Sequence, residues 1–188
     1  MERSRDTVKH LEDSDPTDLD LLKRVADGDE VAFGLLATRL GPTLKRVLFR
    51  LGLTAPEVDD VVQDALIKTW KGSASFQSRS SVSTWVCRIA VNEGISALRR
   101  RPEAASLEPM RVIDPESAWE QQQLISAVRS AITTLPLAER AVIVLREYEG
   151  MTYREIAAVL GIPIGTVMSR LHEARSRVRR KLSRDFEH

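Results

Sequence analysis

Cysteine is nearly absent from this chain of 188 residues, since Cys87 is the single one. One thiol excludes an internal disulfide framework and fits a reducing compartment. No apolar run approaches the ~20 residues that cross a bilayer, and the first residues lack the apolar core of a signal peptide. We therefore expect a cytoplasmic protein that does not insert into a membrane.

A large excess of one charge is also lacking, because the formal net charge is only +1. Hydrophobic residues make up 43% and charged residues 29% of the chain, a balance typical of a folded globular protein. This excludes a globally basic nucleic-acid binder. Any contact with nucleic acid must come from charge that is segregated locally.

The usual signs of catalysis are missing as well. No glycine-rich phosphate loop and no metal-ligand spacing appears, and the three histidines, His10, His172 and His188, are far apart in the sequence. Cys87 has no partner motif, and we interpret it as a small buried apolar residue. We expect no catalytic residue, no metal and no cofactor, and so not an enzyme.

The pattern of apolar residues predicts an all-α fold. Strand-like alternation is absent, and apolar residues recur three and four positions apart. Turn and cap signals divide the chain into helices at 18–26, 30–40, from Gly41-Pro42 to 51, 57–71, 81–101, 118–133, 136–148, 153–160 and 164–184.

One stretch separates these helices into two groups. Residues 102–117 contain three prolines and no helical stripe, and fully extended they could span roughly 50 Å. We expect two small helical domains, at 18–101 and 118–188, joined by this flexible linker. Residues 1–17 read as a flexible tail.

The sequence from Thr152 to Leu171 has the features of a helix-turn-helix. Thr152 and Glu155 are spaced as a capping box, and Ala157 precedes Gly161 by four residues. A small residue lets two helices cross closely, and a glycine can adopt the left-handed turn between them. The apolar residues expected between the two helices are Ile156, Leu160, Ile162, Val167 and Leu171.

The charge of the last helix agrees with a DNA-binding role. The segment between Met168 and His188 contains seven Lys or Arg and only three Asp or Glu. Such a helix suits the DNA backbone, and its first turns would face base edges in the major groove. A solvated basic helix that closes a bundle is the plainer interpretation, and the combined motif makes it less favoured.

The helix at 57–71 carries two contrasting faces. Val58, Val61, Val62, Ala65, Leu66 and Thr69 form its expected core stripe. On the opposite side Ile67 lies among Asp60 and Asp64, with Gln63 beside them. This face either docks another protein or is an ordinary charged surface with one apolar residue.

The next loop and helix carry groups suited to single-stranded DNA. Phe76 lies in a polar loop with Gln77, Ser78 and Arg79, where it could hold an unstacked base or anchor the loop. In the following helix, Arg88, Asn92 and Arg99 fall within one narrow sector, and these residue types contact phosphates and base edges. Trp85 lies in the apolar stripe and is expected in the core.

In their order along the chain these segments resemble a known family. Residues 57–71 resemble the polymerase-binding helix of sigma region two, and residues 80–92, followed by an arginine triplet, resemble its minus-ten recognition segment. Residues 135–150 with the helix-turn-helix resemble sigma region four. Since a third middle region is absent, the resemblance points to the extracytoplasmic-function (ECF) sigma factors.

The resemblance implies a role for each segment. Asp60, Gln63, Asp64 and Ile67 would bind the clamp helices of the largest catalytic subunit of core RNA polymerase, and the flap of the second-largest subunit would be a further contact. Promoter DNA would be the other partner, and an anti-sigma factor would be a regulator. The residues implied for the melted minus-ten strand are Phe76, Gln77, Ser78, Arg79, Arg88, Asn92 and Arg99. Those implied for the minus-thirty-five duplex are Thr166, Met168, Ser169, Arg170, His172 and Arg175.

A conventional transcription regulator is the alternative. It would bind duplex DNA through the helix-turn-helix alone, usually as a symmetric dimer. No segment reads as a dimerisation helix, and this alternative leaves the Ile67 face and the loop at 72–80 without a role.

Overall fold

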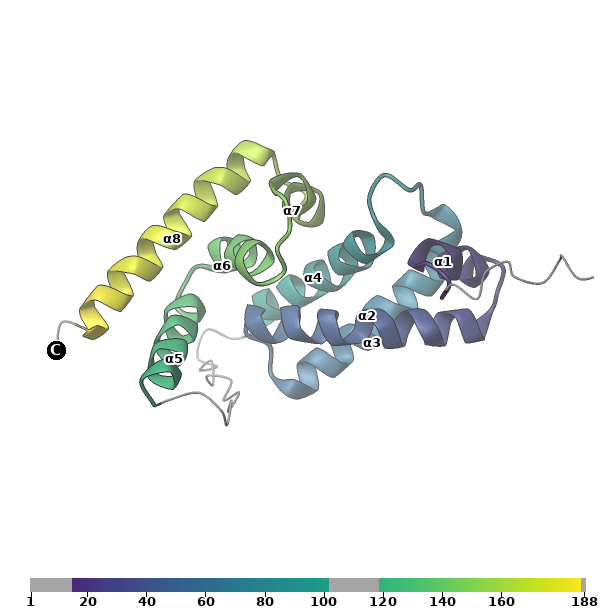
Figure 1. Ribbon diagram of the computed structural model, residues 1–188. Helices are drawn as coiled ribbons and strands as arrows, with labels where there is room; N and C mark the ends of the chain where they lie inside the picture. The colour runs from purple at the N-terminus through teal and green to yellow at the C-terminus, as the bar shows by residue number, and fades with distance from the viewer. Residues whose placement is uncertain (1–14, 102–118, 187–188) are drawn as a thin grey trace, which may run out of the picture.

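The protein folds into two groups of helices that lie side by side in the computed structural model (Figure 1). The structure describes residues 15–101 and 119–186, and within these ranges no strand is present. The expected tail lies almost wholly, and the expected linker wholly, outside the described residues. The predicted all-α class is confirmed.

The first group contains four α-helices and one short 3-10 turn. They are α1 (Asp18–Ala26), α2 (Glu30–Leu51), α3 (Ala55–Gly72), η1 (Ser73–Ser75) and α4 (Val82–Arg100). Polar side chains at the helix starts accept hydrogen bonds from otherwise unpaired backbone amides: Asp29 Oδ1 from Ala32 N at 2.9 Å, and Ser81 Oγ from Thr84 N at 3.0 Å. At the start of α3, the Glu57 carboxylate accepts hydrogen bonds from both the backbone N and Oγ1 of Thr54.

Helix α2 corrects one prediction. We expected a break at Gly41-Pro42, but α2 continues through Pro42 and is 22 residues long in total. Proline removes one backbone donor and disfavours the helix interior. The buried stripe nevertheless runs on across this point, with Leu36 and Leu40 before it and Leu44 after it. Burial of that continuous stripe outweighs the local cost of proline.

The core of the first group is made by helices packed closely on α4. Leu21, Leu48 and Val86 are fully buried, and α4 contacts α1, α2 and α3. At Gly94 a Cβ atom would come within 2.5 Å of Leu48 Cδ2, so glycine is required where α4 crosses α2. The face of α4 that remains is the one carrying Arg88, Asn92 and Arg99.

The second group contains the helix-turn-helix. Its elements are α5 (Trp119–Thr133), α6 (Leu137–Ile143), the π-helical segment η2 (Val144–Tyr148), α7 (Tyr153–Leu160) and α8 (Ile164–Phe186). The predicted capping box is present, because Thr152 Oγ1 accepts from Glu155 N at 3.3 Å and Glu155 accepts from Thr152 N at 2.8 Å. Gly161 has φ +63°, the left-handed conformation that the motif predicts.

The two groups contact each other. Helix α7 packs on α4, and α2 meets both α6 and η2 (Figure 1). The sequence alone did not predict this contact. Among the described helices, none is long and apolar enough to span a bilayer.

Candidate protein and nucleic-acid interfaces

The outward face of α3 is open. Asp60, Gln63 and Asp64 are exposed, and Ile67 is 42% exposed among them. The opposite face is buried at Val58, Val61, Val62, Ala65 and Thr69, as predicted, whereas Leu66 of the same predicted stripe is only half-buried against the core. An aliphatic side chain held in water between carboxylates is available to a partner that offers both an apolar contact and positive charge.

The loop after α3 is anchored by its aromatic residue. Phe76 is half-buried, and its ring centroid lies 5.2 Å from that of Trp85. Gln77, Ser78 and Arg79 are exposed, and Ser78 has φ +52°, a conformation that few non-glycine residues adopt. The contact between Phe76 and Trp85 therefore holds the loop so that its three polar side chains face solvent just before the first turn of α4.

The polar sector of α4 lies partly beside the second group. Arg88, Asn92 and Arg99 are all exposed. Asn92 and Arg99 also line a cavity of about 340 Å³, whose other walls come from α6, α7 and the first turns of α8. Arg170 of α8 lines the same cavity. Residues predicted to contact two different promoter elements thus lie together in the free chain.

The first turns of α8 present a mixed surface. Met168 is 54% exposed, and Ser169 and His172 are exposed beside it. Thr166 is half-buried, and its carbonyl oxygen accepts a hydrogen bond from Ser169 Oγ at 3.1 Å. Of the residues predicted to contact the upstream duplex, Met168, Ser169 and His172 are the ones that are both exposed and not held in an ion pair with another described residue.

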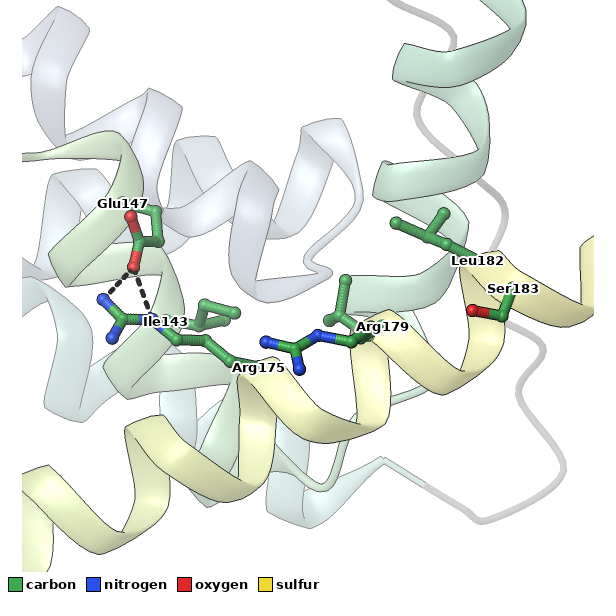
Figure 2. Close-up of a pocket in the computed structure, with 7 residues that line it drawn as sticks. Ile143, Glu147, Arg175, Arg179, Leu182 and Ser183 are labelled. Carbon is green, nitrogen blue, oxygen red and sulfur yellow. Dashed lines mark hydrogen bonds and ion pairs between the residues drawn. The ribbon is translucent and has the colours of Figure 1, made fainter. Parts of the chain in front are cut away.

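Arg175 is directed back toward its own domain. Its Nε donates to Glu147 Oε1 at 3.0 Å, and Figure 2 shows both side chains at one end of a groove between Ile143 and α8. This hydrogen bond raises the pKa of Arg175. The groove has a volume of about 450 Å³, with Val178 and Leu182 contributing apolar surface. A DNA contact by Arg175 requires its ion pair with Glu147 to open.

Other cations of α8 are partly engaged. Arg177 Nε lies 3.0 Å from Glu139 Oε2, and Lys181 Nζ lies 3.4 Å from Asp185 Oδ1. Arg179, Arg180 and Arg184 are exposed. Exposed ion pairs contribute little to stability, so these cations can exchange a carboxylate for a phosphate at small cost.

Two apolar residues of the helix-turn-helix are less buried than predicted. Ile156, Val167 and Leu171 are buried between α7 and α8, as predicted. Leu160 and Ile162 are only half-buried, and they line the cavity against α4. Their apolar character serves the contact between the two groups as well as the motif itself.

Sequence patterns offered no reason to select Glu149. It follows η2, its side chain is 5% exposed, and it lies between two arginines of α2. Glu149 accepts hydrogen bonds from Arg46 Nη2 and Arg50 Nη1, both at 2.9 Å. Arg50 also stacks over the ring of Tyr148, 4.2 Å from its centroid. The residues involved are 99 or more positions apart, so no local pattern indicates them.

Arg140 is the second such residue. It is buried, and its guanidinium donates to the carbonyl oxygen of Leu51 at 2.9 Å, at the last residue of α2. Another hydrogen bond goes to the carbonyl oxygen of Leu135 at 3.0 Å. Burial, together with the nearby charge of Arg101, lowers the pKa of Arg140. A cation at a helix C-terminus is favoured by the helix dipole, which partly offsets this desolvation.

Cys87 is a buried side chain of α4, 1% exposed, which confirms the interpretation from sequence. Burial raises the pKa of its thiol to about 12. The thiolate needed for nucleophilic chemistry is therefore scarce at neutral pH. Among the described residues, no group of His, Cys, Asp and Glu is arranged to hold a metal ion.

Comparison with known proteins agrees with this division into two groups. Sigma-70 region 2 matches residues 36–102, and Sigma-70, region 4 matches residues 125–178. The ECF RNA polymerase sigma-E factor of Escherichia coli K12 is 34% identical, over 88% of this chain and 94% of its own length. The ECF RNA polymerase sigma factor RpoE of Cereibacter sphaeroides is 36% identical, over 90% of this chain and 98% of its own.

Solved structures are similar in fold. CnrH, in complex with the cytosolic domain of CnrY, matches with a TM-score of 0.70 and 29% identity, covering 89% of this chain and 98% of that one. The sigma factor RpoE of Bartonella quintana, in complex with the anti-sigma factor NepR, matches with a TM-score of 0.64 and 25% identity, covering 80% of this chain and 96% of that one.

The chain belongs to the ECF RNA polymerase sigma factors. Sigma factors are non-enzymatic subunits that give RNA polymerase its promoter specificity. Because the matches extend through both helical groups, the alternative of a regulator that uses only the helix-turn-helix is not favoured.

Proposed function

We propose that this sigma factor divides its work between its two helical groups, which we assign to residues 18–101 and 118–188 with a linker at 102–117. The first group binds core polymerase and the melted minus-ten strand. The second binds the minus-thirty-five element as duplex. The observation that carries the proposal is the acidic face of α3 with Ile67 exposed at its centre, in the same chain as a capped helix-turn-helix.

Polymerase binding is assigned to Asp60, Gln63, Asp64 and Ile67. Their exposure leaves the face free, and buried apolar contact supplies affinity while the carboxylates select a basic partner surface. The clamp helices of the largest catalytic subunit are the proposed partner. The groove between Ile143, Val178 and Leu182 is the proposed contact for the flap of the second-largest subunit.

DNA binding is assigned to two surfaces. The exposed loop residues Gln77, Ser78 and Arg79, with Arg88, Asn92 and Arg99 of α4, contact the melted strand, while Phe76 holds the loop on Trp85. Met168, Ser169, Arg170 and His172, with Thr166 and Arg175 beside them, contact the upstream duplex. Exposed arginines of α8 then contact phosphates and make binding dependent on salt.

Regulation and location follow from the same proposal. CnrH and the Bartonella quintana RpoE are each seen with a protein partner, in the second case a named anti-sigma factor, so an anti-sigma factor is the proposed regulator here. The cytoplasm, where polymerase and promoter DNA meet, is the proposed location.

In vitro transcription tests the proposal. Purified chain is added to core polymerase that lacks a specificity subunit, on a library of promoter fragments, and the RNA 5′ ends are sequenced. We expect start sites clustered downstream of a shared pair of sequence elements. Start sites identical to those of core polymerase alone would overturn the assignment.

A further inference from the structure

The exposed part of the first turns of α8 lacks the side chains that most often bind guanine and adenine. The exposed residues between positions 164 and 173 are Ile164, Gly165, Met168, Ser169, His172 and Glu173. Arg and Lys bind the guanine edge in the major groove, and Asn and Gln bind the adenine edge. None of these four residue types is among the exposed residues of this described segment, so a base preference here has to come from other contacts.

The two arginines nearest to Met168 are engaged elsewhere. Arg170 follows Met168 by two positions, or about 200° around the helix, and it lines the cavity beside α4. Arg175 lies about two turns after Met168 on the same side, but its Nη2 is 2.6 Å from Glu147 Oε1 (Figure 2). Over the described residues 164–175, the side of α8 that carries Met168 therefore presents no unpaired Arg or Lys.

Met168 instead lies beside a second apolar side chain. Ile164 precedes it by four positions, so the two share one side of the helix, and they are 43% and 54% exposed, Ile164 first. Single exposed apolar residues are common, but this pair lies at the end of the helix that the motif places in the major groove. Farther along α8, Arg179, Arg180 and Arg184 are exposed. The surface thus combines an apolar end with a cationic continuation.

Duplex DNA presents a partner for each part of this surface. Its phosphates bind the cations, and thymine carries a C5-methyl group in the major groove that apolar side chains contact. Methionine suits such a contact, because its unbranched thioether adapts its shape and donates no hydrogen bond. Guanine at the same place would present acceptors to a side chain without a donor, and a buried acceptor without a partner costs free energy.

We propose that Met168, with Ile164 beside it, selects a thymine in the minus-thirty-five element through the C5-methyl group of that base. This inference rests on the proposed function, which assigns the upstream duplex to α8, and it adds the base that one side chain reads. Arg170 and the exposed cations near the end of α8 bind phosphates, and the choice of base at this position is left to Met168.

Removal of the methyl group from the DNA tests the contact. Each thymine in the upstream element of a promoter selected in the transcription experiment is replaced in turn by deoxyuridine, which lacks only the C5-methyl group. Modified and unmodified promoters compete for limiting holoenzyme, formed from core polymerase and the full chain, and transcripts of different length report their relative use. At one position we expect use to fall about fourfold, the effect of losing one buried methyl group.

Two variants assign that position to a side chain. In Met168→Ala the deoxyuridine penalty is expected to disappear, because the apolar partner of the methyl group has been shortened. Leu124→Ala is the matched control, since Leu124 of α5 is 48% exposed and the change shortens a similarly exposed apolar side chain of the second group. The control should keep the full penalty. Unchanged helicity by circular dichroism shows that both variants fold.

A change of specificity gives the converse test. Met168→Arg supplies hydrogen-bond donors where the wild type has none, and arginine binds O6 and N7 of guanine. With this variant, we expect promoters that carry guanine at or next to the sensitive position to be used about tenfold more than the thymine promoter. A preference for thymine that persists in Met168→Arg would contradict direct reading by residue 168.

The outcomes separate this inference from the function on which it rests. Selected start sites without any position sensitive to deoxyuridine, or a penalty that persists in Met168→Ala, would overturn the reading of thymine and leave the proposed function standing. Start sites identical to those of core polymerase alone would overturn the proposed function, and this inference with it.

Discussion

The two neighbouring helices α3 and α4 differ in what lies beside them. The outward face of α3, with Asp64 and Ile67, is exposed. The elements that pack most closely on α3 are α2, α4 and η1, all of the first group. The sector of α4 with Asn92 and Arg99 is exposed too, but these residues line a cavity whose other walls come from the second group. One helix thus presents a face of its own, and the other shares its polar sector with a second domain.

This difference bears on the two kinds of partner. A partner that binds the α3 face meets a surface made by one helix alone. A strand that binds Asn92 and Arg99 would also lie beside Arg170 of α8, which lines the same cavity.

The largest expected effect concerns the open face. In the Asp64→Ala/Ile67→Arg double variant, we expect affinity for core polymerase to fall at least roughly 100-fold, or about 3 kcal/mol, because an anchor residue and a charge are lost together. Pull-down with core polymerase and titration by fluorescence anisotropy measure this loss.

Leu35→Arg is the control for that variant. Leu35 is an apolar residue of α2 that is 48% exposed, so the change has the same chemistry at another site. Unchanged helicity by circular dichroism shows that both variants fold. Should the double variant bind polymerase as tightly as Leu35→Arg, the α3 face would not be the docking surface.

The proposed DNA-binding side predicts a smaller effect. Replacing Arg170 by Ala is expected to weaken binding of the upstream duplex about tenfold and to reduce the salt dependence of binding by about one charge. Lys23→Ala, at an exposed position of α1, removes an equal charge elsewhere and should change neither quantity. Identical promoter use by the Arg170→Ala variant would show that the contact is misassigned.

The helix-turn-helix predicts a moderate effect on stability. Thr152→Ala removes the side-chain acceptor for the Glu155 amide and should destabilise the second group by about 1 kcal/mol. Thermal unfolding measures this, and an unchanged melting curve would contradict the role of the cap. Thr54→Ala in the first group is the companion variant, and if the two groups unfold separately, each substitution shifts a different transition.

The smallest expected effect concerns Cys87. Because burial raises the pKa of its thiol to about 12, the native chain should react hardly at all with a maleimide between pH 7 and pH 8. Full labelling should appear only in denaturant, as read by intact-mass spectrometry. Rapid labelling of the native chain would mean that the core around α4 opens readily.

Local patterns predicted most of the helices and the exposed faces. The capping box at Thr152, the left-handed Gly161 and the exposed Ile67 each follow from spacing within a few residues, and the structure has all three. The break at Pro42 was wrong, because burial of Leu40 and Leu44 in one stripe outweighs a local helix breaker.

The contact between the two groups was beyond sequence reasoning. Glu149 binds Arg46 and Arg50, which lie about 100 positions away in the sequence. No local sequence pattern shows that a charged residue has a partner so distant. Half-buried Leu160 and Ile162 fit the helix-turn-helix pattern, so nothing in their spacing reveals a second role. The functions of the individual site residues stay predictions.

The accessibility of two engineered thiols tests the contrast between α3 and α4 most directly. Lys71→Cys places a thiol at the exposed end of the α3 face, and Ser96→Cys places one in the cavity beside α4. We expect the thiol at position 71 to react much faster in the free chain, because Ser96 is half-buried, and to be protected when core polymerase is added without DNA. Equal rates in the free chain, or a thiol at position 71 that polymerase leaves equally reactive, would contradict an open polymerase-binding face on α3.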